Sequence, residues 1–256
     1  MCIRDRPGRE LLTDRLGDLI EHTHSSFVLV NAENAAGGSG ITPPIVSELL
    51  GIGIDCLTTG DHVFKRKEIL PVLESDHRIL RPANLPPEAS GKGVTVLPDR
   101  SGRRVGVINL LGRVFMNRPV DCPFRTVDVL LEGLADETDL ILVDMHAEAT
   151  SEKIAMGWYL DGRVTAVVGT HTHVQTADER VLPGGTAYVT DLGMTGPHDS
   201  VLGRDKDRVI RAITTGMPTH FDVAKGDVRI NGVLITVNPE TGLATAIKRI
   251  CVTDDQ

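Results

Sequence analysis

The sequence predicts a single α/β domain, and three observations support this prediction. Short apolar runs rich in β-branched residues alternate with segments of helical periodicity over most of the chain. At 256 residues, the chain is long enough for one large domain and short for two. Several apolar runs end in Asn, Asp or His residues, and ligands in α/β proteins bind beyond the carboxyl ends of the strands.

The individual elements follow from this alternation. Helical periodicity predicts helices over residues 8–22, 44–50, 65–73, 126–134, 151–159 and 205–215, with Thr150 or Ser151 capping the fifth. Apolar runs predict strands over 27–31, 54–59, 78–80, 93–97, 104–110, 140–145, 164–169 and 187–190. The tail alternates apolar and polar residues over 221–224, 227–236 and 243–251, which predicts an antiparallel end to the sheet.

Composition excludes several classes of protein. No apolar stretch is long enough to cross a membrane, and the first residues lack the apolar core of a signal peptide. Four scattered cysteines without pairing or zinc spacing predict a reducing, cytoplasmic location. A net charge of -8 and 3% aromatic residues argue against a dedicated nucleic-acid surface. A small phosphorylated ligand held by metal ions remains compatible with this charge.

The apolar run 164–170 ends in His171-Thr172-His173. Side chains two residues apart on extended backbone point the same way, so the two imidazoles predict a metal site. Imidazole together with carboxylate suits zinc, iron or manganese. His22 and His24 have the same spacing but end a predicted helix, where histidine interacts favourably with the helix dipole. Spacing without strand context therefore does not indicate a metal site.

Polar residues gather at five junctions between strands and loops. If the carboxyl ends of the strands meet at one edge, these junctions converge on one crevice. Carboxylates, amides and imidazoles together are what a two-metal hydrolytic site requires. Among them, Asp144, Glu148 and Asp191 are expected to orient loops or ligand histidines rather than to bind metal. The junctions are 31–34, 59–62, 144–148, 169–173 and 190–193.

The same junctions carry a family resemblance. The blocks 31–36, 60–62, 146–153, 169–178 and 191–197 resemble the signature blocks of the YmdB-like metallophosphoesterases, from about Pro7 to the C-terminus. The resemblance implies a calcineurin-like sandwich of two sheets flanked by helices, forming one domain over residues 7–256. It also implies a dinuclear iron or manganese centre and phosphodiesterase activity on cyclic nucleotides, with hydrolysis by a metal-bridging hydroxide.

The resemblance also assigns roles to individual residues. Glu33 resembles the carboxylate that bridges both metals, and His62 matches the family's proton donor. Asp61 stands where the family usually has an asparagine ligand of the second metal, a change that keeps an oxygen ligand. The remaining ligands by resemblance are Asn34 and His173 for the first metal, and His146 and His171 for the second.

The N-terminus departs from the family pattern. The family opens with a central strand ending in an aspartate that binds the first metal, and here that position holds Cys2. Residues 1–6 are therefore expected to be a truncated or misassembled start, with the first central strand and its ligand both missing. The first metal is then expected to bind weakly.

Two functions remain open at this point. The leading hypothesis is a metal-dependent phosphodiesterase acting on a cyclic nucleotide or another small phosphodiester. The alternative is a regulatory protein that binds metal and nucleotide without turnover, because the N-terminal aspartate is absent. Amidohydrolase chemistry is disfavoured, since the β/α units are too few for a barrel of eight. Sequence leaves the oligomeric state open, with a homo-oligomer as one expectation.

Overall fold

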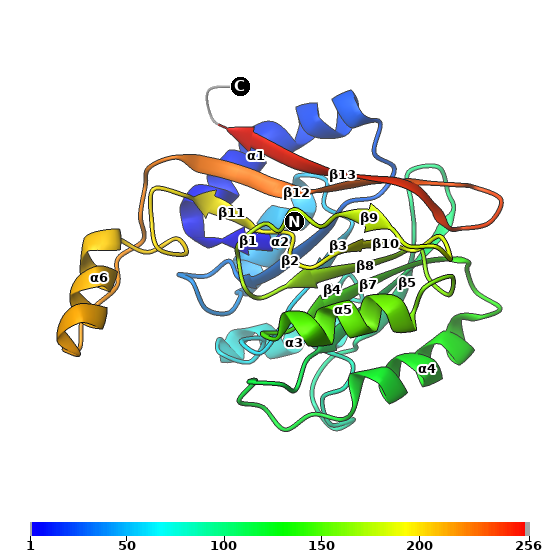
Figure 1. The fold of residues 1–256 in the computed structure, drawn as a ribbon, viewed down its shortest axis with the longest axis horizontal. Helices are drawn as coiled ribbons and strands as arrows, with labels where there is room; N and C mark the ends of the chain where they lie inside the picture. Colours follow the sequence, from blue (N-terminus) through cyan, green and yellow to red (C-terminus); the bar gives the residue numbers. More distant parts are fainter. Residues whose placement is uncertain (1, 254–256) are drawn as a thin grey trace.

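Two β-sheets packed face to face form the centre of the molecule in the computed structural model, which describes residues 2–253 (Figure 1). Apolar side chains from both sheets fill the space between them, with Leu29 and Cys56 from one sheet meeting Val107 and Leu142 from the other. The predicted architecture of two sheets flanked by helices is confirmed. None of the helices in the described part of the chain is both long and apolar enough to span a membrane.

The first sheet has the strand order β13-β12-β11-β1-β2-β3-β4. Its strands from β11 through β1 to β4 run parallel, and β12 and β13 add an antiparallel hairpin at one edge. The antiparallel end predicted from the tail is therefore present. The strands are β1 (Cys2–Arg4), β2 (Leu29–Asn34), β3 (Cys56–Thr58), β4 (Ile79–Leu80), β11 (Met194–Pro197), β12 (Val228–Val237) and β13 (Ala244–Thr253).

The second sheet has the strand order β5-β6-β7-β8-β10-β9. Its four central strands are parallel, and the two edge strands are antiparallel to their neighbours. The strands are β5 (Val94–Pro98), β6 (Arg104–Leu111), β7 (Leu140–His146), β8 (Ala166–Thr170), β9 (Arg180–Val181) and β10 (Ala187–Val189). Parallel strands whose carboxyl ends lie at one edge bring their following loops together.

Helices cover the outer faces of both sheets. The helices α1 (Asp5–Thr23), α2 (Pro43–Gly51) and α3 (Leu70–Ser75), with the short 3-10 helix η1 (Lys67–Ile69), pack on the first sheet. The helices α4 (Pro123–Leu134) and α5 (Thr150–Tyr159) pack on the second. The last helix, α6 (Lys206–Thr215), stands away from the body at the left of Figure 1, and Val209 is its one buried residue.

The expectation of a missing first strand is wrong. Residues Cys2–Arg4 form β1 in the middle of the first sheet, pairing with both β2 and β11. Cys2 and Ile3 are buried, so two apolar residues are enough to occupy a place whose hydrogen-bonding partners already exist in the neighbouring strands. The aspartate ligand is nevertheless absent. Asp5 begins α1 and faces Arg4 and Arg204, at 3.9 and 3.8 Å.

Other elements differ from the prediction for local reasons. The helix predicted over 65–73 divides into η1 and α3, because Pro71 has no N–H to continue a helix and instead lies in its first turn. No strand forms over 221–224, where a single bridge joins Val223 to Arg204. The strands β9 and β11 were not predicted, because two and four residues are too few to show a period.

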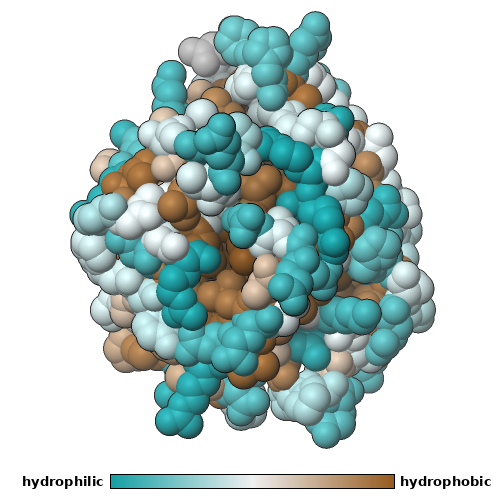
Figure 2. Space-filling model, turned by 90° about the vertical axis from the view of Figure 1, so that its right-hand side faces the viewer, coloured by the Kyte–Doolittle hydropathy of each residue, from teal (hydrophilic) through white to brown (hydrophobic). Residues whose placement is uncertain are grey.

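A cavity of about 330 Å³ opens between the two sheets at the end opposite the carboxyl ends of the parallel strands. Figure 2, which views the right-hand end of Figure 1, shows a hollow with a hydrophobic floor and a hydrophilic rim. Asn31, Thr58 and Asp144 close the inner end of this cavity. Asn31 and Asp144 are the first residues of two of the predicted polar junctions, and Glu33 and His146 follow them at the carboxyl ends of the same strands.

Candidate metal centre

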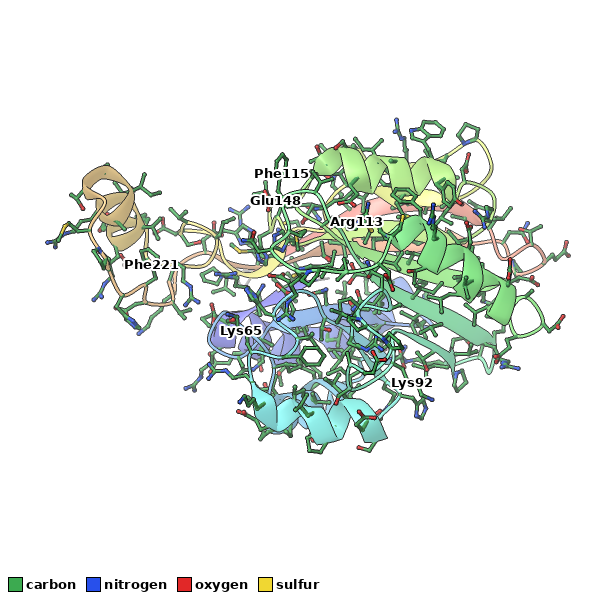
Figure 3. The ribbon with its side chains drawn as sticks, turned by 90° about the horizontal axis from the view of Figure 1, so that it is seen from below. Lys65, Lys92, Arg113, Phe115, Glu148 and Phe221 are labelled. Carbon is green, nitrogen blue, oxygen red and sulfur yellow. The ribbon has the colours of Figure 1, made fainter. Side chains whose placement is uncertain are left out.

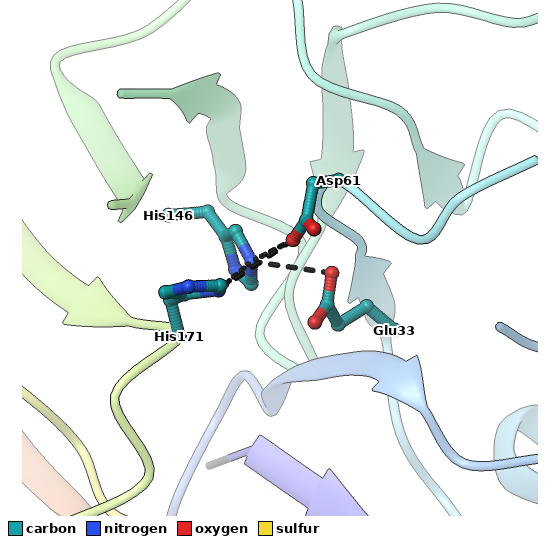
Figure 4. Close-up of side chains that lie close together, drawn as sticks. All are labelled: Glu33, Asp61, His146 and His171. Carbon is teal, nitrogen blue, oxygen red and sulfur yellow. Dashed lines mark hydrogen bonds and ion pairs between the residues drawn. The ribbon is translucent and has the colours of Figure 1, made fainter. Parts of the chain in front are cut away.

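Four side chains of metal-ligand type converge at the carboxyl ends of four strands (Figure 4). Glu33 belongs to β2, Asp61 follows β3, His146 ends β7 and His171 follows β8. One potential ligand atom from each lies within 4.8 Å of the others. His146 Nε2 is 3.1 Å from Glu33 Oε2, 3.2 Å from Asp61 Oδ1 and 3.0 Å from His171 Nδ1.

The charges of this cluster favour a bound cation. Burial by itself would raise the pKa of Glu33, but His146 and His62 outweigh it and hold that pKa well below its usual range. Burial would also raise the pKa of Asp61, but hydrogen bonds with His146 and His171 outweigh it and hold that pKa below its usual range. Burial would lower the pKa of His146, yet Glu33 and Asp61 raise it to about 10. Two carboxylates that favour their ionised form at one buried point suit a bound cation.

The donor set and the available space both fit a metal ion. Two carboxylates and two imidazoles are ligands that suit zinc, iron or manganese. The space is kept open by Gly60, because a Cβ atom there would lie 2.2 Å from both Glu33 Oε2 and His146 Nε2. A glycine immediately before Asp61 therefore allows the loop after β3 to approach the buried side chains of Glu33 and His146.

A chain of hydrogen bonds orients His146. Thr170 Oγ1 donates to Asp144 Oδ1 at 2.7 Å and lies 2.9 Å from His146 Nδ1. Because the single hydroxyl hydrogen is used on Asp144, the oxygen accepts from Nδ1–H, which leaves Nε2 to face the cluster. Asp144 is buried and also accepts from Asn31 Nδ2 at 2.9 Å and Thr58 Oγ1 at 2.5 Å. Thr170 was not among the sequence-predicted residues, although it directly precedes His171.

His62 lies beside the cluster on its more open side. Its Nδ1 is 3.0 Å from Asn34 Oδ1 and 3.4 Å from Glu33 Oε1, and its Nε2 is 3.6 Å from Asp61 Oδ2. Hydrogen bonding to Glu33 raises the pKa of His62 above its ordinary value. The side chain is 30% exposed, so a protonated imidazole here is accessible to a bound substrate.

Asn34 and His173 form a second group next to the first. Asn34 Nδ2 donates to Glu33 Oε1 at 2.8 Å and lies 3.3 Å from His173 Nε2. The guanidinium of Arg4 also reaches His173 Nε2, at 3.2 Å, and Cys2 Sγ is 3.9 Å from His173 Nδ1. Burial, followed by the charge of Arg4, lowers the pKa of His173 to about 3. Glu33 thus faces His146 with one oxygen and Asn34 with the other.

The two histidines of the His171-Thr172-His173 segment do not point the same way. β8 ends at Thr170, and the φ angles of His171 and His173 are 94° and 63°, so the extended backbone on which that expectation rested stops before them. His171 joins the four-residue cluster and His173 faces Asn34. His22 and His24, which have the same spacing, lie at the C-terminal end of α1 as expected, with His24 as its C-cap.

The rim of the centre is formed by the loops after β6 and β7. Gly112 N donates to His146 O at 2.9 Å, which holds the loop after β6 against the end of β7. Glu148 lies on that rim with one carboxylate oxygen 3.1 Å from His171 Nε2. Figure 3 shows Arg113 and Phe115 on the same side of the molecule as Glu148, and Phe115 is 82% exposed.

Comparison with known proteins assigns the chain to a family. The profile of the YmdB-like proteins matches residues 3–250. The chain belongs to the YmdB-like family. A relative from Bacillus subtilis named 2′,3′-cyclic-nucleotide 2′-phosphodiesterase is 45% identical over 249 residues, which cover 97% of this YmdB-like chain and 94% of the relative.

Solved structures agree with this assignment. A crystal structure described as a novel phosphatase from Mycoplasma pneumoniae matches this YmdB-like chain with a TM-score of 0.90 at 34% identity, covering 98% of this chain and 91% of that one. A putative 5′-nucleotidase from Staphylococcus aureus matches with a TM-score of 0.58 at 16% identity, covering 96% and 49%, and shares the fold alone. The YmdB-like chain is thus a hydrolytic phosphoesterase, and a regulatory protein without turnover has no support.

Proposed function

We propose that this protein is a metal-dependent phosphodiesterase that hydrolyses 2′,3′-cyclic nucleotides or closely related small phosphodiesters. The observation that carries the proposal is the convergence of Glu33, Asp61, His146 and His171 on one point. The substrate class is supported by the 45% identical relative named as a 2′,3′-cyclic-nucleotide phosphodiesterase. The cytoplasmic location expected from the four scattered cysteines of the sequence is part of this proposal.

The residues that would hold metal fall into two groups that share Glu33. Glu33, Asp61, His146 and His171 would hold one ion, and Glu33, Asn34 and His173 would contact a second. Bound iron or manganese ions supply Lewis acidity toward phosphoryl oxygens and lower the pKa of a bound water. The protein contributes a largely buried donor set, in which the potential ligand atoms of the four-residue cluster lie within 4.8 Å of one another.

The group of Glu33, Asn34 and His173 corresponds to the first metal of the family resemblance. It is expected to bind its ion more weakly than the four-residue cluster. Burial raises the pKa of the Cys2 thiol well above its ordinary value, so this residue stays neutral where the family has an aspartate. The guanidinium of Arg4 already lies against His173. A titration with Mn²⁺ should therefore show one tight and one weaker site per chain, and two equally tight sites would contradict this reasoning.

His62 is placed to donate a proton to the departing ribose oxygen. Hydrogen bonding to Glu33 raises the pKa of His62, which favours the protonated imidazole, and its partial exposure allows contact with substrate. Replacement by glutamine should slow hydrolysis of a 2′,3′-cyclic nucleotide by about 100-fold or more. Bound metal should remain unchanged, because His62 is outside the four-residue cluster.

Two substrates test both parts of this proposal. The wild-type protein with added Mn²⁺ should convert 2′,3′-cyclic AMP to a nucleoside monophosphate, and tight nucleotide binding without product would refute the assignment. With bis(p-nitrophenyl) phosphate the leaving group departs as a stable anion and needs no proton, so His62→Gln should be impaired far less. Equal loss on both substrates, or loss of metal, would show that His62 is not a proton donor.

A further inference from the structure

A buried ion pair lies behind the two histidines that serve the two halves of the centre. Lys153 on α5 and Asp191 in the loop after β10 are joined at 2.9 Å between Nζ and Oδ2. The exposed fractions of their side chains are 0% and 1%. Two charges removed from water are tolerated only if they are closely paired and make further hydrogen bonds. The groups to which Lys153 and Asp191 donate or accept these further hydrogen bonds therefore indicate the role of the pair.

The pair holds Thr172, the residue between His171 and His173, by both its backbone and its side chain. Asp191 Oδ2 accepts from the Thr172 backbone N–H at 3.1 Å and from its hydroxyl at 2.6 Å. The Lys153 ammonium donates to the same hydroxyl at 3.0 Å. The Thr172 hydroxyl therefore accepts from one partner of the ion pair and donates to the other.

The segment held in this way has an unfavourable backbone conformation. His171 and His173 both have positive φ, a region in which residues other than glycine are strained. Such a conformation persists only where surrounding contacts over-determine it. The contacts of Thr172 with Lys153 and Asp191 meet that requirement, because they hold both its backbone N–H and its side-chain hydroxyl.

The direction of the chain at Thr172 decides which group each histidine joins. His171 Nδ1 lies 3.5 Å from Asp61 Oδ1, whereas His173 Nε2 lies 3.3 Å from Asn34 Nδ2. On a continued strand both imidazoles would lie on one side. The turn at Thr172 therefore separates them.

Gly169 and Gly193 both lie against this ion pair. A Cβ atom on Gly169, within β8, would lie 1.8 Å from Thr190 O and 2.8 Å from Lys153 Cδ, so glycine lets β8 pack against both the Thr190 backbone and the lysine stem. Asp191 Oδ1 accepts from the Gly193 backbone N–H at 2.8 Å, which fixes the carboxylate from its other end. Both members of the ion pair are therefore held rigidly.

We propose that Lys153 and Asp191 are positioning residues of the metal centre: through Thr172 they direct His171 into one metal-binding group and His173 into the other. This inference rests on the metal centre of the proposed function. Neither residue touches the four-residue cluster, so both act through the histidine turn.

The test compares single and double replacements in the full-length protein, with Co²⁺ as the probe metal. Lys153→Met and Asp191→Asn each leave one buried group without its partner and should lower thermal stability in EDTA. The double variant leaves no unpaired charge, so its stability should recover part of the loss. Co²⁺ affinity should fall about 10- to 100-fold in all three variants, with a changed visible absorption spectrum, because the histidine turn is no longer held.

The double variant distinguishes positioning from a purely structural role. A purely structural role predicts that Co²⁺ affinity recovers together with stability, and that result would overturn the proposal, as would unchanged affinity in Lys153→Met. If the single variants do not fold, the double variant alone decides between these outcomes. Asp178→Asn is the matched control, because Asp178 accepts from Thr176 and Thr190 in the neighbouring loop without contacting Thr172. Wild-type protein that binds no Co²⁺ would refute the metal centre itself, and this inference with it.

Discussion

Replacing Thr170 by valine removes one buried hydroxyl and keeps the shape of the side chain. In the structure this hydroxyl connects Asp144 to His146, donating to the first and accepting from the second. Valine would leave the Asp144 Oδ1 atom with one donor fewer and the Nδ1–H of His146 without its acceptor. We therefore predict a loss both of stability and of metal affinity.

The size of each effect follows from the kind of hydrogen bond that is lost. A hydrogen bond to a charged group contributes about 1.5–3 kcal/mol, and an orphaned buried partner adds to the cost, so destabilisation of about 2–4 kcal/mol is expected. For a chain of this length, that corresponds to a decrease in Tm of roughly 4–16 °C. Loss of the group that orients a metal-binding histidine typically lowers metal affinity by about 10- to 100-fold.

Thr165→Val provides the matched control. Thr165 is also fully buried, lies immediately before the same strand, and uses its hydroxyl to accept from Ile141 N at 3.0 Å and donate to Gly242 O at 2.6 Å. Thermal unfolding in EDTA and calorimetric Mn²⁺ titration should show both variants destabilised, but only Thr170→Val weakened in metal binding. Unchanged Mn²⁺ affinity in Thr170→Val, with stability lowered, would refute the orienting role of the hydroxyl.

Three further predictions concern other parts of the chain. Burial disfavours the charged form of Asp99, but hydrogen bonds from Ser101 and Arg103 lower its pKa to about 2 from the usual 3.8. The ionised carboxylate therefore contributes to folding stability above about pH 4, and this contribution is lost as the pH falls toward 2. Asp99→Asn should therefore be less stable in urea at pH 7 and approach wild-type stability near pH 2, and an equal difference at both pH values would contradict this. Gly60→Ala should abolish metal binding, measured by elemental analysis, because its Cβ overlaps Glu33 and His146, and retained metal would refute the close approach. Asp61→Asn keeps an oxygen ligand and should retain metal-dependent phosphodiesterase activity within about tenfold in steady-state assays, whereas complete loss would show that the carboxylate charge is essential.

The N-terminus shows where reasoning from sequence was incomplete. Residues 2–4 contain only two apolar side chains, which is too short a run to indicate a strand. They nevertheless form β1, because β2 and β11 present unpaired backbone groups on either side of this segment. The same contacts bring Arg4 against His173, a neighbour that spacing along the chain could not indicate.

The sequence by itself determined the α/β class, the carboxyl strand ends as the place of function, and the residue types that gather there. These properties are local, because strand periodicity and the polar residue that ends a strand are both visible in a short window. It also determined the family, since the blocks around Glu33, His146 and His171 are long and specific.

Only the tertiary structure decided how these side chains are grouped. Which ligand atoms face one another depends on backbone turns and on residues distant in sequence, such as the positive φ at His171 and His173 and the ion pair of Lys153 with Asp191. The hydroxyl of Thr170 and the missing side chain of Gly60 matter for the same reason. Close packing of several chain segments at one point creates these constraints, and no single segment contains them.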